Sequence, residues 1–552
     1  MNNSNIKRSD MINCSLCHDA TCTVACERID PAKVLRSIWF DNEKVAVLHL
    51  PSENPCTDCS APCEKMCIHS GKVPVKELIM KLYDDVKPEI SYVGEADISS
   101  ELTGNRDVRE RSGKRCSADD NILRTDICGI PLENPFLLSS SVVSSNYDMC
   151  ARAFEAGWAG AVFKTVCSFE IHECSPRFGA LPGSAGGFVG FKNIEQLSEK
   201  GVEKNMDMIR KLKSDYPDKA LIVSYMGQNE TEWGELARIC EENGADGVEL
   251  NFSCPNMADG SLGSTIGQVP GLVETFTAAA KKNCNIPVIA KLTPNVANMS
   301  DAAEAAKRGG ADGVAAINTI KSVMGLDPDN FVSSPDVHGM SATGGYSGNA
   351  VKPIALRFIA EMGNNRNLSG MHISGMGGIE TWRDALDFLL LGAGSLQVTT
   401  AVMKYGYRII EDLTSGLAYY LERRFQEESS VLKMKNGNDR DAGGTVDQDT
   451  EENGTGLPVN VKEIVGLGLP HISDTTDVLE RDTVVFPLFD KSKCAGCGRC
   501  VISCSDGGHQ ALTMKDDRSI KLDGSKCVGC HLCALVCPEG AIKTDGKRIQ
   551  RQ

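Results

Sequence analysis

The chain has 552 residues, and at roughly 100–200 residues per domain this length predicts three or four domains. Hydrophobic residues make up 41% and charged residues 24%, which excludes a collagen-like or wholly disordered chain. With 58 Lys and Arg against 74 Asp and Glu the net charge is −16, and no basic cluster is interleaved with aromatic residues, so nucleic acid and anionic membranes are poor candidate partners.

Cysteine is the unusual component of the composition, with 24 residues. Eight lie between Cys14 and Cys67, eight between Cys494 and Cys537, and eight are scattered from Cys116 to Cys284. No apolar run approaches the ~18–20 residues that span a bilayer, and the start of the chain lacks the apolar core of a signal peptide, so we expect a cytoplasmic protein. Thiols stay reduced in the cytoplasm, so the cysteine clusters predict metal or redox cofactors and not disulfides.

The N-terminal cysteines form two runs of four, Cys14-x2-Cys17-x4-Cys22-x3-Cys26 and Cys56-x2-Cys59-x3-Cys63-x3-Cys67. Four thiolates can ligate one iron–sulfur cluster, so we predict two clusters here; zinc sites with four cysteine ligands are the alternative. The sequence leaves open whether each run holds its own cluster or exchanges its fourth ligand. Apolar residues at helical spacing in 29–50 and 72–86 predict a small helical iron–sulfur domain over residues 1–87, followed by a linker over 88–125.

Eight short apolar, β-rich runs alternate with amphipathic helical stretches between residues 126 and 428. This repetition predicts an α/β fold, a (β/α)8 TIM barrel, and a doubly wound sheet is the less regular alternative. In a barrel the ends of the strands share one face, where active sites are built. The runs begin near residues 136, 159, 220, 247, 287, 313, 371 and 395 and end near Ser140, Lys164, Met226, Asn251, Lys291, Asn318, Gly377 and Thr399.

Two lysines at strand ends, Lys164 and Lys291, favour an anionic or electron-rich ligand at this face, with snorkelling structural lysines as the alternative. The segments 374–379 and 397–400 put glycines and hydroxyls after the last two strands, where barrels of this kind bind phosphate. No G-x-G-x-x-G motif opens a βαβ unit, so no dinucleotide site is predicted. A phosphate site beside cluster domains favours FMN.

The C-terminal domain is predicted over residues 483–552, after a partly disordered linker over 429–482. Its cysteines repeat the spacing of two-cluster bacterial ferredoxins, in which the fourth cysteine of each run ligates the other cluster. We therefore expect two [4Fe–4S] clusters, with zinc sites as the alternative. The expected ligands are Cys494, Cys497, Cys500 and Cys537 for one cluster and Cys504, Cys527, Cys530 and Cys533 for the other.

Several motifs of the barrel segment resemble the dihydroorotate/dihydropyrimidine dehydrogenase family, and most closely its bacterial NAD-dependent dihydropyrimidine branch with FMN and two ferredoxin clusters. The motifs are NFSCPN (251–256), KT (164–165), KLTPN (291–295), INT (317–319), GGYSG (344–348) and SGMGGIE (374–380). The resemblance implies FMN contacts at Ser140, Lys164, Thr165, Lys291, Gly348, Gly377, Gly378, Ile379, Thr399 and Thr400. It implies pyrimidine contacts at Asn193, Asn251, Phe252, Ser253, Asn318 and Thr319, and a catalytic acid/base at Cys254.

These implied roles agree with the chemistry of the residues. Reduction of the C5–C6 double bond of uracil or thymine needs a hydride from FMN and a proton from the opposite face. A thiol suits the second task because its unperturbed pKa, ~8.5, lies near cytoplasmic pH. Asn carboxamides offer a donor and an acceptor to a pyrimidine ring. A buried structural thiol is the alternative for Cys254.

Two features depart from the resemblance. The short bacterial subunit lacks the N-terminal extension of this chain. We expect the clusters of this extension to receive electrons from a separate NADH-oxidising flavoprotein or a ferredoxin, in a dimer or heteromer. Asn256 stands where the fused pyrimidine enzymes have His, as in soluble dihydroorotate dehydrogenases, whereas Glu195 resembles the dihydropyrimidine branch and would repel the carboxylate of orotate. We predict uracil or thymine interconversion with the 5,6-dihydro form; dihydroorotate oxidation and a non-catalytic electron-transfer protein are the alternatives.

Overall fold

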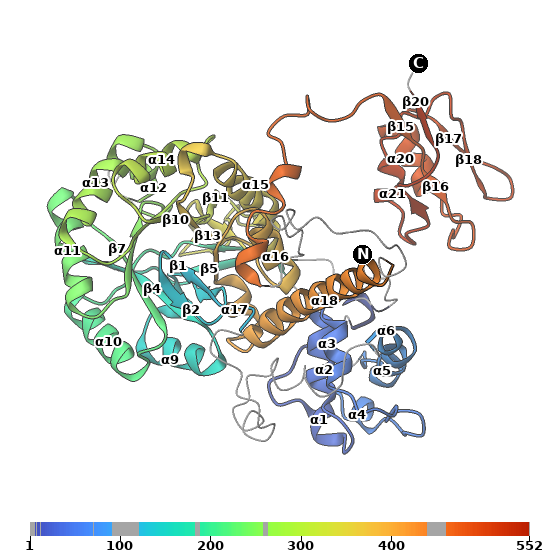
Figure 1. Ribbon diagram of the computed structural model, residues 1–552, viewed down its shortest axis with the longest axis horizontal. Coiled ribbons are helices and arrows are strands. Elements are labelled where there is room, and N and C mark those ends of the chain that lie inside the picture. The colour runs from blue at the N-terminus through green and yellow to red at the C-terminus, as the bar shows by residue number, and fades with distance from the viewer. Residues whose placement is uncertain are drawn as a thin grey trace, which may run out of the picture. The chain divides into compact units, whose positions relative to one another are not determined.

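The computed structural model describes residues 6–90, 121–182, 188–257, 263–438 and 460–550, with single gaps at residues 7, 12 and 70. The chain divides into two compact units, Met1–Ile472 and Ser473–Gln552 (Figure 1). Residues 91–120 of the first predicted linker and 439–459 of the second lie outside the described residues. No helix in the described ranges is long and apolar enough to cross a membrane.

The larger unit contains a closed barrel of eight parallel strands, which confirms the predicted fold class (Figure 1). Almost every residue of these strands is buried, as expected of parallel strands covered by helices outside and packed side chains inside. Each predicted run corresponds to one strand. The strands are β3 (Phe136–Leu138), β4 (Gly160–Cys167), β7 (Ala220–Met226), β8 (Gly247–Asn251), β9 (Val288–Lys291), β10 (Gly313–Ala316), β13 (His372–Met376) and β14 (Ser395–Val398).

Helices surround the barrel, and several begin at side-chain caps that the sequence supplies (Figure 1). Asn146 and Asn229 each accept a backbone N–H bond at a helix start, and Thr381 forms a capping box with Asp384. The helices are α9 (Tyr147–Ala156), α10 (Val202–Asp215), α11 (Glu230–Glu242), α12 (Ser264–Gly267), α13 (Pro270–Asn283), α14 (Ser300–Arg308), α15 (Lys352–Gly363), α16 (Trp382–Leu390), α17 (Thr400–Tyr405) and α18 (Ile409–Asn438).

Two small sheets complete the barrel. The hairpin of β1 (Thr125–Ile127) and β2 (Ile130–Leu132) packs its apolar side chains against residues at the starts of the barrel strands. An antiparallel sheet in the order β11-β12-β6-β5 is built from segments that follow β4 and β10, so it stands at the carboxyl ends of the strands. Its strands are β5 (Phe178–Pro182), β6 (Phe188–Asn193), β11 (Ile320–Ser322) and β12 (Gly344–Ser347).

The N-terminal segment is helical, as predicted, and has its own apolar core around Val34, Ile38 and Leu78. It also packs on the barrel: the Phe40 ring is buried at 5.0 Å from the Tyr405 ring, and Arg36 Nε lies 2.9 Å from Asp412 Oδ2. The segment predicted as a separate domain is therefore part of the same compact unit. Its elements are η1 (Arg8–Met11), α1 (Thr21–Ala25), α2 (Pro31–Trp39), α3 (Glu43–Leu48), α4 (Pro62–Lys65), α5 (Val75–Lys81), η2 (Leu82–Val86) and α6 (Lys87–Ile90).

Part of the linker predicted over residues 429–482 is structured. Helix α19 (Val461–Ile464) buries Val461 and Ile464 in the barrel core, and the last barrel helix, α18, extends to Asn438. The polar composition around this short apolar segment concealed it in the sequence. The remaining short helical turns are η4 (Val142–Ser144), η5 (Asn349–Val351), η6 (Arg366–Leu368) and η8 (Leu469–His471).

The smaller unit consists of three antiparallel strand pairs and two short helices, with Leu512 and Ile542 packed against Cys500 and Cys533. Its helices are α20 (Arg499–Gly507) and α21 (Leu532–Leu535). Its strands are β15 (Thr483–Val485), β16 (Leu488–Phe489), β17 (Leu512–Met514), β18 (Ile520–Leu522), β19 (Ile542–Lys543) and β20 (Arg548–Gln550), paired β15 with β20, β16 with β19 and β17 with β18.

Candidate active site

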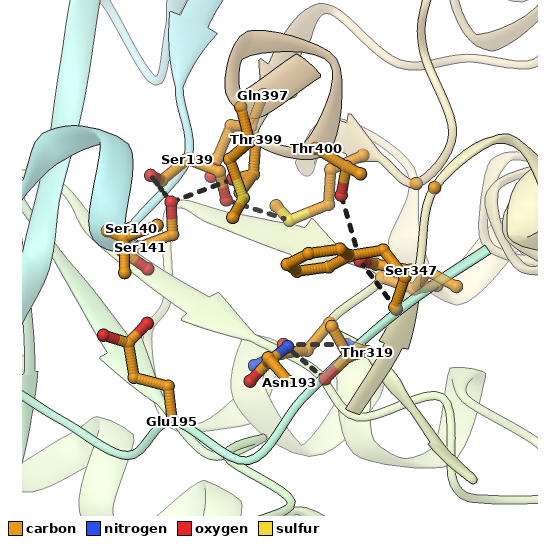
Figure 2. A pocket seen from close by; sticks show the side chains of 18 of the residues that line it. Ser139, Ser140, Ser141, Asn193, Glu195, Thr319, Ser347, Gln397, Thr399 and Thr400 are labelled. Carbon is orange, nitrogen blue, oxygen red and sulfur yellow. Dashed lines mark hydrogen bonds between the residues drawn. The ribbon is translucent and has the colours of Figure 1, made fainter. Parts of the chain in front are cut away.

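A cavity opens where the barrel strands end. Figure 2 shows Ser139, Thr399 and Gln397 on one side of its open centre and Asn193 and Thr319 on the opposite side. The residues brought to this cavity include every one for which the resemblance implies an FMN contact: Ser140, Lys164, Thr165, Lys291, Gly348, Gly377, Gly378, Ile379, Thr399 and Thr400. Cys254 and four of the six implied pyrimidine contacts, Asn193, Asn251, Asn318 and Thr319, line the same cavity.

Phe252 and Ser253 do not line the cavity. The Phe252 ring is fully buried and lies 4.9 Å from the Trp233 ring of α11, so it belongs to the core between barrel and helices. Ser253 Oγ donates to Asn251 Oδ1 at 2.9 Å and accepts from Asn318 Nδ2 at 2.7 Å. Ser253 thus fixes the orientation of two asparagines that do reach the cavity.

Lys291 forms a buried ion pair at the base of the cavity. Its Nζ lies 3.2 Å from Oε1 of Glu249, a fully buried carboxylate on β8, and donates to Ser140 Oγ at 2.9 Å. Gln397 Nε2 donates to the other oxygen of Glu249 at 3.0 Å, while Gln397 Oε1 is buried without a hydrogen-bond partner. Glu249 was not among the predicted site residues, although a charged residue within an apolar strand is a recognisable signal.

Lys164 is also paired, so neither lysine presents a lone positive charge to a ligand. Its Nζ lies 2.8 Å from Oε1 of Glu195, which also lies 3.3 Å from an Arg177 nitrogen. Lys164 and Arg177 both contact the Glu195 carboxylate, which reduces the repulsion that Glu195 would exert on the carboxylate of orotate.

Cys254 lies in the turn after β8, and its side chain is buried. Burial raises the pKa of the Cys254 thiol to about 11, against the opposing effect of a hydrogen bond from the Asn256 backbone. The group is therefore a thiol at neutral pH, and it can donate a proton but rarely accepts one. Asn256 Nδ2 donates to Asn193 Oδ1 at 3.3 Å and to the Glu195 carbonyl at 2.6 Å, whereas Asn256 Oδ1 is buried without a partner.

Three glycines with positive φ form one wall of the cavity: Gly348 (+94°), Gly377 (+125°) and Gly378 (+84°). Two hydroxyl pairs line the same cavity, Ser347 with Thr400 at 2.9 Å and Ser141 with Thr399 at 3.0 Å. Backbone without side chains beside several hydroxyls is suited to phosphate oxygens.

The cysteine-rich segments present cavities lined by four cysteines each. Cys494, Cys497, Cys500 and Cys537 line one in the smaller unit. Cys14, Cys17 and Cys22 line another together with Cys67 from the second N-terminal run. In the described part of the chain, no three His, Cys, Asp or Glu side chains converge closely enough to hold a single metal ion.

Comparison with known proteins assigns both units. The family model for dihydroorotate dehydrogenase matches residues 122–421, and the model for the 4Fe-4S dicluster domain matches residues 488–544. The chain belongs to the dihydroorotate dehydrogenase family. It is therefore an oxidoreductase of a flavin-dependent family, with an iron–sulfur domain at its C-terminus.

Three relatives place the chain within this family. It is 48% identical to the NAD-dependent dihydropyrimidine dehydrogenase subunit PreA of Escherichia coli, over 71% of this chain and 88% of the relative. It is 36% identical to the chloroplastic dihydropyrimidine dehydrogenase (NADP(+)) of Arabidopsis thaliana, over 54% of this chain and 74% of the relative. The catalytic subunit of dihydroorotate dehydrogenase B of Pyrococcus abyssi is 37% identical, over 54% of this chain and 94% of the relative.

The cavity fits the flavin that the family implies. The glycine wall lets a phosphate approach the backbone closely because it has no side chains, and the buried, unpartnered Gln397 Oε1 is an acceptor for a polar ring edge. Lys291 and Ser140 add donors at the base of the cavity. These features lie in one continuous cavity, as a ligand with both a phosphate and a ring system requires.

Gly378→Ala is expected to weaken FMN binding while leaving the barrel folded. The new Cβ would lie 2.9 Å from the Gly348 carbonyl oxygen and from Lys352 Cβ, at a φ that disfavours alanine. Strain of about 1–3 kcal/mol corresponds to roughly 5–150-fold weaker binding. Titration of the apoprotein with FMN measures this affinity, and Gly370→Ala is the matched control, since Gly370 has φ +79° and nothing within 4 Å of its Cβ position. Equal affinity in Gly378→Ala and wild type would contradict the assignment.

Proposed function

We propose that this chain interconverts uracil or thymine with the 5,6-dihydro form, using FMN for hydride transfer and Cys254 for the proton. The observation that carries the proposal is the convergence of Cys254, four amide and hydroxyl side chains and the glycine wall on one cavity. The 48% identical dihydropyrimidine dehydrogenase subunit supports this substrate class.

The asparagines hold the pyrimidine in this proposal. Asn193, Asn251 and Asn318 line the cavity and offer donors and acceptors to the carbonyl and N–H groups of the ring. Ser253 fixes Asn251 and Asn318, and Asn256 fixes Asn193, so the amides are oriented before substrate binds. Such preorganisation lowers the entropy cost of placing C5 next to the proton donor.

Bound FMN would supply hydride chemistry to the ring, held by the glycine wall, Thr399, Thr400, Lys291 and Lys164. The remaining step, protonation of the ring at C5, is carried out by a residue of this chain. Cys254 donates its thiol proton to C5, and its raised pKa keeps that proton in place until the ring carbon becomes basic. Cys254 is only 5% exposed, which limits contact of the thiol with water during the transfer.

Electrons reach the site in this proposal through iron–sulfur clusters. The C-terminal domain holds two [4Fe–4S] clusters on the cysteines predicted from its spacing, and the N-terminal segment holds two more. The cavity that joins Cys14, Cys17 and Cys22 with Cys67 favours exchange of the fourth ligand, which leaves Cys26, Cys56, Cys59 and Cys63 for the other cluster. A separate NADH-oxidising flavoprotein or a ferredoxin donates the electrons, in a cytoplasmic dimer or heteromer.

A set of serine variants distinguishes exchange of the fourth ligand between the two N-terminal runs from an arrangement in which each run ligates its own cluster. In a Cys56→Ser, Cys59→Ser background only one N-terminal cluster should form. Adding Cys67→Ser is expected to remove this remaining cluster, and adding Cys26→Ser is expected to leave it, because Cys67 lines the cavity of Cys14, Cys17 and Cys22. Iron content and the electron paramagnetic resonance signal measure the outcome. The reverse result would show that each run ligates its own cluster.

The proposed substrate is tested by anaerobic turnover of cluster-replete, FMN-loaded protein. Reduced viologen serves as donor, since it bypasses the unknown partner, and uracil, thymine and orotate are supplied separately. Consumption of uracil or thymine is expected. Consumption of orotate alone would overturn the proposal in favour of dihydroorotate oxidation, and no reaction with any of them would favour a non-catalytic electron-transfer protein.

Dihydroorotate oxidation is the second candidate, and two observations favour it. Asn256 stands beside Asn193 with a buried, unpartnered Oδ1, where the fused pyrimidine enzymes have His. The charge of Glu195 is balanced by Lys164 and Arg177, so repulsion of a carboxylate substrate is reduced. The greater identity and coverage of the dihydropyrimidine dehydrogenase relative place this candidate second.

A further inference from the structure

The cysteine-lined cavity of the N-terminal segment is completed by residues of the barrel. Its cysteines are Cys14, Cys17, Cys22 and Cys67. Arg408, which directly precedes barrel helix α18, and Glu411, in the first turn of this helix, also line the cavity. Figure 1 shows α18 running beside the N-terminal helix α3, and the ion pair of Arg36 with Asp412 joins α2 to the same barrel helix. The barrel therefore contributes to the surroundings of any group that the four cysteines bind.

The loop between the first two of these cysteines is fixed to the barrel. Arg408 Nη2 donates to the carbonyl of Leu16 at 2.9 Å, and the Leu16 side chain packs against the apolar core of the barrel. Leu16 has a φ of +50°, a left-handed conformation that leucine rarely adopts and that persists only where surrounding contacts hold it. The guanidinium of Arg408 is thus held at the loop that carries Cys14 and Cys17.

The positive charge of Arg408 is not balanced by a paired carboxylate. Both neighbouring carboxylates of α18 pair with Arg36 instead: Glu411 contacts it directly, and Asp412 Oδ2 lies 2.9 Å from Arg36 Nε. Among the residues that the structure describes, Arg408 itself forms no ion pair. Besides Arg36, the charged residues that the N-terminal segment contributes to the cavity wall are Asp19, Asp30 and Lys33. The barrel thus brings the charge of Arg408 to a cavity lined by four thiols.

This arrangement fits an iron–sulfur cluster. A [4Fe–4S] cluster with four thiolate ligands is anionic, and reduction by one electron makes it more anionic. The potential of such a cluster depends on its net charge, on hydrogen bonds to its sulfurs and on its exposure to solvent. A cation held at the ligand loop stabilises the reduced form more than the oxidised form, because the attraction grows with the negative charge of the cluster.

We propose that Arg408 raises the reduction potential of the cluster in this cavity, so that the barrel tunes the cluster docked on it; this inference rests on the N-terminal clusters of the proposed function. In the reduction step one electron passes from the proposed flavoprotein or ferredoxin donor to the cluster. No bond is made or broken, and no proton is needed. The hydrogen bond to Leu16 keeps the charge of Arg408 at the ligand loop.

A charge series at Arg408 tests this inference in the full-length, cluster-loaded protein. Potentials are measured by anaerobic redox titration with electron paramagnetic resonance, and the signal of this cluster is the one that Cys17→Ser abolishes or alters. Arg408→Gln removes the charge but retains an N–H donor for Leu16. It is expected to lower the equilibrium constant for reduction about tenfold, a shift of ~59 mV to lower potential for a one-electron couple. Arg408→Lys should stay near wild type, and Arg408→Glu should shift about twice as far as Arg408→Gln.

A second variant leaves the Leu16 contact intact. Glu411→Gln removes a negative charge from the same cavity wall and is expected to raise the potential. Arg357→Met is the matched control: Arg357 Nη2 also donates to a backbone carbonyl, that of Ala297 at 2.7 Å, but Arg357 does not line the cavity. The C-terminal clusters serve as an internal reference, because the cysteine-lined cavity of the smaller unit contains no barrel residue, and their potentials should stay constant in every variant.

The outcomes separate this inference from the proposed function. Wild-type protein without a signal that depends on Cys17 overturns the proposed N-terminal cluster. A cluster with the same potential in Arg408→Gln and wild type overturns the role of Arg408 and leaves the proposed cluster intact. Equal shifts in the Lys, Gln and Glu variants would also overturn it, because they would indicate a structural role that does not depend on charge. If Arg408→Gln assembles no cluster, an unchanged potential in Glu411→Gln overturns the inference.

Discussion

Cys254→Ser is expected to lower the rate of pyrimidine reduction by about 10²–10⁴-fold and to leave the FMN content unchanged. A serine hydroxyl has nearly the same shape as the thiol but is a far weaker acid, so the proton for C5 is lost while the glycine wall that holds the flavin is intact. Anaerobic mixing of reduced protein with uracil, followed by the absorption of oxidised flavin, measures the effect. Cys167→Ser is the matched control, because Cys167 is a buried thiol at the end of β4 that does not line the cavity. Equal rates in Cys254→Ser and wild type would contradict the role of Cys254.

The raised pKa of Cys254 sets the pH dependence of pyrimidine reduction and of the reverse oxidation. Reduction needs the thiol, which is the main form at every pH below about 11, so the part of the rate that depends on Cys254 should stay flat across neutral pH. Oxidation of the dihydropyrimidine needs the thiolate, and its rate should rise about tenfold per pH unit below that value. The burial of the thiol therefore favours a site that works as a reductase near neutral pH.

Glu249→Gln is expected to destabilise the barrel by about 3–5 kcal/mol, because it leaves the Lys291 ammonium buried without a counter-charge. Urea unfolding followed by tryptophan fluorescence measures the loss, since Trp158, Trp233 and Trp382 belong to the core of the barrel. The variant should also bind FMN more weakly, because Ser140 and Gln397 lose the carboxylate that orients them.

The double variant Glu249→Gln, Lys291→Met is the control for this prediction. Removal of both charges should restore most of the free energy of unfolding that the single variant loses, although FMN binding should remain impaired. A single variant within about 1 kcal/mol of wild type, or a double variant no more stable than the single one, would show that the ion pair does not carry the stability of this site.

The barrel strands could be predicted because their signal is local. Each strand is a short apolar run followed by a polar residue or glycine, and each predicted run proved to be one strand. The resemblance then indicated residues that the fold brings to one cavity. The sheet over the barrel mouth could not be predicted in the same way, because β5 is largely exposed and β6 is only partly buried.

The contacts that could not be predicted depend on how the barrel closes and on which segments pack against it. Glu249 and Lys291 lie on neighbouring strands, and their pairing follows from register and not from sequence spacing. Phe252 shares its motif with Cys254, yet it packs on Trp233 outside the cavity. The burial of Phe40 beside Tyr405 could not be predicted, because composition does not show where the N-terminal segment packs on the barrel.

In the proposed reaction, reduced flavin in this cavity passes its electrons to a pyrimidine base, with Cys254 as proton donor. One anaerobic measurement tests it most directly: reduced full-length protein is mixed in turn with uracil, thymine and orotate, and the absorption of oxidised flavin is followed. Uracil or thymine should oxidise the flavin rapidly in wild type and slowly in Cys254→Ser. Flavin that is oxidised by orotate alone, or by none of the three, would contradict the account.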